Sequence, residues 1–128
     1  MDLRVLVLPT DLEWTTRVAV EGRLDSKTSP EFEKKMDPIL SQPMDFLILD
    51  LAKVPFISSA GIRALMYVNR TLAANQSKVI CINMQPQIAM VMETVKLLPG
   101  LHVFPSDEEM DKFLTEIQEE VLKKKNKS

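Results

Sequence analysis

Hydrophobic residues follow two different periods along the 128-residue chain. Near the N-terminus they occupy alternate positions in Leu3–Val7 and again in Val18–Val20, and a period of two is typical of half-buried β-strands. Trp14 lies between these segments, in a connection expected to close a hairpin. Short apolar runs predict three later strands, the first two with the unbroken pattern of strands covered on both faces: 46–49, 79–82 and 102–104.

Apolar residues elsewhere recur at spacings of three and four, which predicts amphipathic helices. Two of these helices are preceded by sequences typical of a capping box, Thr28-Ser29-Pro30-Glu31 and Ser106-Asp107-Glu108-Glu109. The order of elements is therefore β-β-α-β-α-β-α-β-α, an α/β domain with a mixed sheet packed by about four helices. The four apolar stripes are Phe32, Met36, Ile39 and Leu40; Ile62, Leu65, Met66, Leu72 and Ala73; Ile88, Val91, Met92 and Val95; and Met110, Phe113, Leu114, Ile117 and Val121.

The length suits one domain, which we expect to span residues 1–122, followed by a basic tail over 123–128 that should fray. The lysines of this tail could contact anionic lipid or nucleic acid. A solvated terminus that complements the C-terminal end of the last helix is the favoured interpretation.

Composition excludes several functional classes. A net charge of −2 gives no global basic field for nucleic acid, and the apolar runs are far shorter than the roughly 20 residues of a membrane span, so we expect a cytoplasmic protein without membrane insertion. A single histidine, His102, and a single cysteine, Cys81, exclude an internal disulfide, a four-cysteine zinc site and a CxxC redox pair. With three glycines, no nucleotide-binding glycine loop can be written. The eight scattered methionines indicate core filling rather than a metal site, and no cofactor is expected.

The most unusual segment is DLAKVPFISSAGIR, residues 50–63, which joins a buried strand to a helix through a proline and two serines. If Ser58 or Ser59 caps the helix, a hydroxyl stands beside unpaired backbone amides, and Gly61 lets another molecule approach the backbone. A phosphate there would add about −1.5 to −2 charges, tolerated by the helix N-terminus but disruptive to a partner packed over it. This arrangement would form a binding switch.

Local physics alone favours a simpler role, in which Ser58 and Ser59 only cap the helix. A catalytic serine is less favoured still, because it would need a base and nothing in the pattern places His102 nearby.

Three motifs, in order, resemble the STAS domain, the fold of bacterial anti-sigma-factor antagonists. The first is Gly22-Arg23-Leu24-Asp25, similar to the family's G-x-L-D after the second strand. The second is LDLAKVPFISSAGIRAL, residues 49–65, similar to the family's strand, hydrophobic pair and D/S-S-x-G turn. The third is a helix opened by Pro86 and closed by Leu98-Pro99-Gly100-Leu101. The resemblance covers residues 3 to about 115.

The family's phosphoacceptor, two positions before the motif glycine, falls on Ser59. Ser58 occupies a position often held by aspartate, which removes a carboxylate from beside the acceptor. Ala60 replaces a common hydroxyl residue and so removes a competing acceptor.

The resemblance also implies a partner-binding surface around this turn, formed by Asp25, Ser58, Ser59, Ala60, Gly61, Ile62 and Arg63. Asp25 would lie near Ser59 if both occupy the same end of the sheet. As an equal alternative, Asp25 is a turn residue or helix cap.

The resemblance implies a partner switch rather than an enzyme. The unphosphorylated protein would bind a histidine-kinase-like serine kinase that acts as an anti-sigma factor, and so free its target. Phosphorylation of Ser59 by that kinase, with ATP and magnesium, would end binding, and a metal-dependent serine phosphatase would reset the switch. The output could be transcription or another process.

Two other interpretations stay open. The STAS fold also serves as a scaffold subunit of lipid-transport or other multiprotein complexes without a phosphoswitch, and as a cytoplasmic part of anion transporters. A phosphoaspartate receiver, suggested by Asp11, Glu13 and Asp50, is disfavoured because TTRVAVEG forms a second strand where receivers have a helix.

Overall fold

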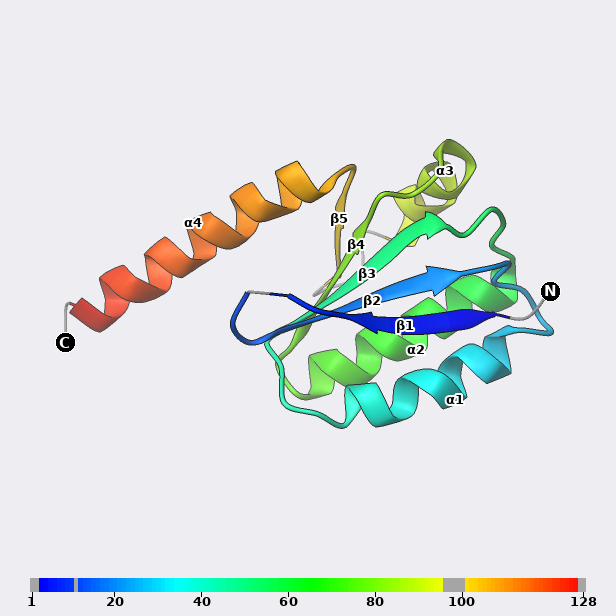
Figure 1. Cartoon of the computed structure of the whole chain (residues 1–128), viewed down its shortest axis with the longest axis horizontal. Helices are drawn as coiled ribbons and strands as arrows, with labels where there is room; N and C mark the ends of the chain where they lie inside the picture. Colours follow the sequence, from blue (N-terminus) through cyan, green and yellow to red (C-terminus); the bar gives the residue numbers. More distant parts are fainter. Residues whose placement is uncertain (1–2, 11, 96–100, 127–128) are drawn as a thin grey trace.

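The computed structural model describes residues 3–10, 12–95 and 101–126, and they form one sheet with four helices (Figure 1). The observed element order confirms the order predicted from the sequence. The strands are β1 (Arg4–Leu8), β2 (Thr15–Glu21), β3 (Phe46–Lys53), β4 (Lys78–Ile82) and β5 (Leu101–Phe104). The helices are α1 (Ser29–Leu40), α2 (Ser59–Ala74), α3 (Pro86–Val95) and α4 (Asp107–Asn126).

The sheet is mixed and its strands lie in sequence order, β1-β2-β3-β4-β5. β1 and β2 pair antiparallel, as expected for a hairpin, and every later pair is parallel. Because parallel neighbours require a crossover, α1, α2 and α3 each connect one strand to the next. A row of paired residues crosses the four parallel strands in register: Val18, Leu49, Cys81 and Val103.

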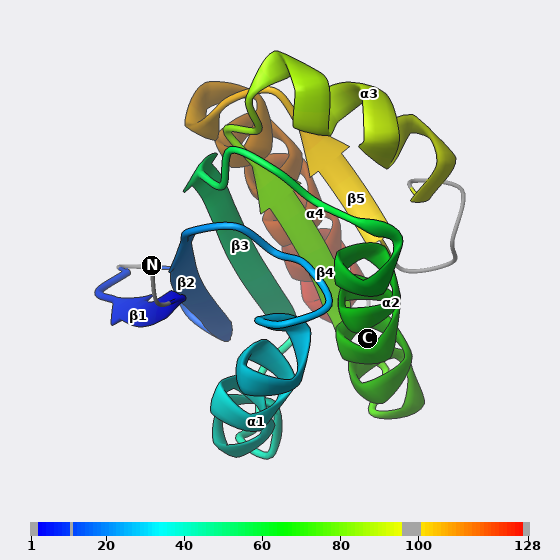
Figure 2. The same cartoon turned by 90° about the vertical axis from the view of Figure 1, so that its right-hand side faces the viewer.

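The two faces of the sheet are covered unequally. α1 and α2 lie side by side against one face, and Figure 2 shows α4 behind the other. The larger core lies under α1, α2 and α3 and takes the predicted stripe residues Phe32, Met36 and Leu40. The smaller core lies under α4 and consists of Ile48, Ile80, Ile82, Met110 and Leu114. The strands at the centre of the sheet are therefore buried on both faces, which explains their unbroken apolar runs.

α1 begins where the sequence predicted, but the predicted capping box is not formed. Thr28 has a helical backbone (φ −92°, ψ −20°), and its side chain accepts no capping hydrogen bond. Its hydroxyl instead donates to the carbonyl of Arg23 at 2.7 Å, and Glu31 forms an ion pair with Lys35 at 3.0 Å. At the other predicted box, Ser106 does cap α4, because its hydroxyl accepts from the amide of Glu109 at 3.4 Å.

α4 continues through Asn126, so residues 123–126, which we expected to fray, are helical in the structure. Residues 127–128 and the predicted helix-closing residues 98–100 lie outside the described part of the chain. Pro86 does open α3, and Leu101 begins β5. No described helix is both long and apolar enough to cross a membrane.

Candidate functional site

The two adjacent serines at the start of α2 have different environments. Ser58 has an extended backbone (φ −98°, ψ 176°) and is the N-cap: its hydroxyl accepts from the amide of Gly61 at 3.3 Å. Ser59 is the first helical residue and is exposed, and its hydroxyl makes no hydrogen bond within the described residues. The capping role left open between the two serines therefore belongs to Ser58, and Ser59 presents a hydroxyl to solvent.

The G-x-L-D segment lies directly against the serine turn. The amide of Leu24 donates to the carbonyl of Phe56, and the amide of Ser58 donates to the carbonyl of Leu24, both at 3.0 Å. Leu24 also forms a parallel bridge with Ile57, which extends the pairing of β2 with β3 by one step. The two motifs, far apart in sequence, therefore lie together beyond the same end of the sheet.

Gly61 is needed for packing within the chain. A Cβ atom on Gly61 would lie 2.3 Å from the carbonyl oxygen of Leu24 and 2.8 Å from Cγ1 of Ile57. The sequence suggested that this glycine admits another molecule, and that interpretation is wrong because the chain's own Leu24 fills the space. Gly61 sets how closely the two motifs approach each other.

Asp25 organises the loop that precedes α1. Its carboxylate accepts from the amides of Lys27 at 3.0 Å and Thr28 at 3.1 Å. Hydrogen bonds from Thr28, and to a lesser extent from Lys27 and Arg23, hold the pKa of this carboxyl below its usual range. Of the two roles considered for Asp25, these contacts give it that of a turn residue.

The remaining predicted contact residues lie on the first turns of α2. Ala60 is half-buried, and Ile62 is half-buried and packs against the larger core. Arg63 is exposed, one helical turn after Ser59. Arg63 and Ser59 therefore offer the most accessible polar groups of the predicted surface.

Sequence reasoning missed the contacts that support the segment between β3 and α2. The guanidinium of Arg23 lies 4.3 Å from the ring centroid of Phe56, a residue that is 40% exposed. Gln85 and Gln87, at the start of α3, donate to the carbonyls of Ala52 at 3.0 Å and Pro55 at 3.1 Å. These contacts join residues brought together only by the sheet, so no local pattern signals them.

A second polar cluster on the α4 side of the sheet was also missed. Arg17 forms ion pairs with Asp50 at 3.0 Å and with Asp107 at 2.6 Å. The side-chain amide of Asn83 donates to both carboxylates. The Arg17 guanidinium holds the pKa of Asp107 below its usual range, and the two carboxylates raise the pKa of Arg17. The cluster ties the start of α4 to β2 and β3. The sequence signal for this cluster was Arg17, a charged residue within a strand of alternating apolar residues.

His102 is half-buried and contacts Phe104 and Phe113, two rings that pack against the smaller core. Its ring centroid lies 4.8 Å from that of Phe113, and burial, with a smaller effect of Lys78, lowers its pKa. Within the described part of the chain, no group of three or more His, Cys, Asp or Glu side chains could hold a metal ion.

The chain matches the model of the STAS domain family over residues 11–110 and belongs to that family. The topology agrees, since β2 follows β1 directly where a receiver domain would have a helix. A search of curated proteins found no match.

Solved structures share the fold at low sequence identity. An anti-sigma factor antagonist from Mycobacterium paratuberculosis is 21% identical, with a TM-score of 0.64, over 84% of this chain and 90% of that one. The cell fate determinant SpoIIAA of Bacillus in its phosphorylated form is 19% identical, with a TM-score of 0.62, over 86% of this chain and 99% of that one. The murine anion transporter Slc26a9 is 20% identical, with a TM-score of 0.70, but the match covers 88% of this chain and only 22% of the transporter.

Proposed function

We propose that this chain is a cytoplasmic, phosphorylation-controlled partner switch of the anti-sigma-factor-antagonist kind, with Ser59 as the acceptor. In the unphosphorylated state it binds a histidine-kinase-like serine kinase and frees that kinase's target. Phosphorylation of Ser59 by the kinase ends the interaction, and a metal-dependent serine phosphatase restores it. The chain is a substrate and binding module in this cycle, and the catalysts are its partners.

The proposal rests on the different environments of the two serines. Ser58 is occupied as the helix cap, whereas the exposed Ser59 hydroxyl is available to another enzyme. Similarity to SpoIIAA, solved in a phosphorylated form, supports a phosphoswitch on this fold.

The position of Ser59 suits a phosphate. The first amides of a helix lack intrahelical partners, and the N-terminal end of the helix dipole favours negative charge, so a phosphate on Ser59 leaves α2 folded. Arg63 stands at the i+4 position, where a cation pairs with an anion one turn before it. The same phosphate, at about −1.5 to −2 charges, would be costly to bury under a bound partner. The fold survives and the interface is lost.

The acceptor is tested with a purified histidine-kinase-like serine kinase from the same organism, ATP and magnesium. We expect one added phosphate by intact-mass measurement, located on Ser59 by peptide mass spectrometry, and no phosphate on Ser59→Ala. Ser58→Ala is the matched control and should still be phosphorylated. Phosphate on Ser58 or elsewhere in Ser59→Ala would contradict the assignment.

Binding to the same kinase tests the switch. Ser59→Ala should bind like the wild type, and Ser59→Glu should bind at least about tenfold more weakly, a loss of about 1.4 kcal/mol. Equal binding by both variants would contradict the proposal. The alternative function is that of a scaffold subunit of a lipid-transport or other multiprotein complex without a phosphoswitch, and this alternative predicts equal binding by both variants.

A further inference from the structure

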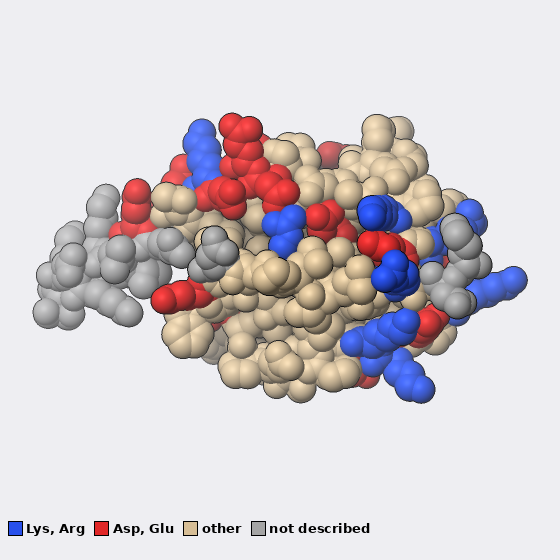
Figure 3. All heavy atoms as spheres, viewed as in Figure 1, with Lys and Arg blue, Asp and Glu red and all other residues tan. Residues whose placement is uncertain are grey.

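Exposed basic side chains gather where β2 and β3 end, around the serine turn. The side chain of Arg23 is 56% exposed and that of Lys53 is 74% exposed. Figure 3 shows Lys and Arg side chains collected at the end of the molecule where these strands finish in Figure 1. We call six exposed cations of this surface the basic patch: Arg4, Arg23, Lys27, Lys35, Lys53 and Arg63.

Contacts within the chain join one half of the patch along the edge of the sheet. The carboxylate of Glu21 lies 3.4 Å from Arg4 and 3.6 Å from Lys53, so it links the start of β1 to the end of β3. The ammonium group of Lys35 donates to the carbonyl of Leu3 at 3.0 Å, which places this α1 side chain beside the start of β1. Three elements therefore contribute cations to one surface.

The other half of the patch adjoins the serine turn. Arg63 lies one helical turn after Ser59 on α2. Arg23 belongs to the segment that pairs with the serine turn, and its guanidinium lies over the exposed ring of Phe56. A molecule that reaches the hydroxyl of Ser59 therefore comes close to these cations.

The carboxylates on this surface are already paired. The side chains of Glu21 and Asp25 are only 21% and 22% exposed. Glu21 faces two cations, Asp25 accepts from two backbone amides, and Glu31 forms an ion pair at 3.0 Å with a lysine of the patch. Three described carboxylates thus accompany six more exposed or equally exposed cations, and the surface is positive although the whole chain has a net charge of −2.

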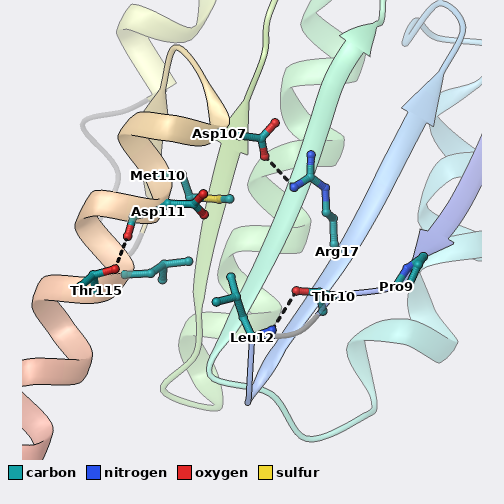
Figure 4. A pocket seen from close by; sticks show the side chains of 9 residues that line it. Pro9, Thr10, Leu12, Arg17, Asp107, Met110, Asp111 and Thr115 are labelled. Carbon is teal, nitrogen blue, oxygen red and sulfur yellow. Dashed lines mark hydrogen bonds and ion pairs between the residues drawn. The ribbon is translucent and has the colours of Figure 1, made fainter.

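Acidic side chains gather in a different region, over the first turns of α4. Asp107, Glu108, Glu109 and Asp111 lie there, and Figure 3 shows carboxylates clustered over this part of the helix. A groove of about 550 Å³ lies beside them, in which Arg17 points toward Asp107 (Figure 4). The start of α4 therefore repels an acidic molecule, whereas the basic patch attracts it.

We propose that the basic patch is the docking surface for a partner whose contact surface is predominantly acidic, and that charge attraction steers the encounter. The inference rests on the proposed function in one respect: the partner is the kinase that acts on Ser59. Opposite potentials on two proteins raise the rate of association and fix the orientation in which they meet. The asymmetry between the patch and the start of α4 directs that kinase to the serine turn.

The mixture of charges favours a protein over a lipid surface or a nucleic acid. Phosphate groups of a membrane or a nucleic acid are all negative and would be repelled by Glu21, Asp25 and Glu31. A protein can place a basic residue opposite each of these carboxylates. The exposed ring of Phe56 adds an aromatic group of the kind enriched at protein interfaces.

The patch also gives phosphorylation an electrostatic effect on binding. A phosphate on Ser59 adds about −1.5 to −2 charges. It would offset much of the excess of six cations over three carboxylates on this surface. The phosphorylated chain should then lose the attraction that brings the kinase to it.

Stopped-flow association with the purified histidine-kinase-like serine kinase tests the proposal. The association rate constant of the wild type should fall as the salt concentration rises, because at about 0.1 M the screening length is only about 10 Å. Lys53→Glu and Arg63→Glu should each lower this rate constant at least about threefold at low salt, with a smaller effect on dissociation. Lys112→Glu is the matched control: it makes the same change of charge at an exposed position on α4 and should associate like the wild type.

The outcomes separate this inference from the proposed function. If the kinase phosphorylates Ser59 but both patch variants associate as fast as Lys112→Glu, the basic patch is not the docking surface and the phosphoswitch stands. If the kinase neither binds nor phosphorylates the chain, both proposals fail. Binding to phosphatidylserine-containing vesicles or to duplex DNA at about 0.15 M salt, weakened by Lys53→Glu, would overturn the choice of a protein partner.

Discussion

The carbonyl oxygen of Leu24 lies where a side chain at position 61 would have to stand, 2.3 Å from the place of the Cβ atom of Gly61. Gly61→Ala should therefore destabilise the fold, by about 1–3 kcal/mol or more, because both neighbours are held in the larger core. Urea unfolding measures the change. On helix propensity alone the same substitution would stabilise α2 by up to about 1 kcal/mol, so an unchanged or higher unfolding free energy would contradict the packing argument.

Substitutions of Ser58 and Ser59 should change the free energy of unfolding by different amounts. Ser58→Ala removes the N-cap of α2 and should lower the free energy of unfolding by about 1 kcal/mol. Ser59→Ala removes an exposed hydroxyl and should change it by less than about 0.5 kcal/mol. Urea unfolding of both variants provides the comparison. An equal loss for the two would show that the cap is not confined to Ser58.

The ion pair of Arg17 and Asp107 should stabilise the fold only at pH values where the Asp107 carboxyl is ionised. Because the folded-state pKa of Asp107 lies below its ordinary value of about 3.9, its contribution is complete above that value and is lost as the pH falls through the folded-state pKa. Asp107→Asn should thus be less stable than the wild type at neutral pH, by at most about 1 kcal/mol since the side chain is partly exposed. The difference should close as the pH falls below 4.

Thermal unfolding across this pH range measures the effect. Asp111→Asn is the control, because Asp111 lies on the same helix and makes no ion pair within the described part of the chain. A difference between Asp107→Asn and wild type that persists at low pH would rule out the ionised carboxylate as its source.

His102 should make the fold sensitive to mild acid. Burial lowers its folded-state pKa below the ordinary value of about 6.5, so the unfolded chain takes up the proton first and stability falls as the pH drops through that value. His102→Phe keeps an aromatic ring against Phe113 and should remove this slope. The free energies of unfolding of wild type and His102→Phe, measured between pH 5 and 8, test this difference in slope. Parallel curves of unfolding free energy against pH would contradict the prediction.

Local sequence patterns predicted the elements of the fold. The alternation around Val18 and the unbroken runs at 46–49 and 79–82 identified strands because burial on one face or on two leaves different periods. The α2 stripe was found for the same reason: residues such as Leu65 and Leu72 face one core.

Contacts between distant segments could not be predicted in this way. Nothing near Gly61 in the sequence shows that Leu24 fills its space, and nothing near Thr28 shows that its hydroxyl is taken by Arg23. The Arg17 cluster draws on four separate segments. Such contacts depend on strand register, which local periodicity leaves open.

The bridge between Leu24 and Ile57 has a consequence for any enzyme that would act on Ser59, as we propose. A peptide that spans only residues 56–63 lacks Leu24, whose carbonyl accepts from the amide of Ser58 in the folded domain. Without this hydrogen bond, the start of α2 is not held in its helical conformation. The surface that such an enzyme would meet is therefore composite, assembled from two segments only when the domain is folded. Modification of Ser59 would thus report that the chain has reached its native state, and a misfolded copy would escape the regulatory cycle.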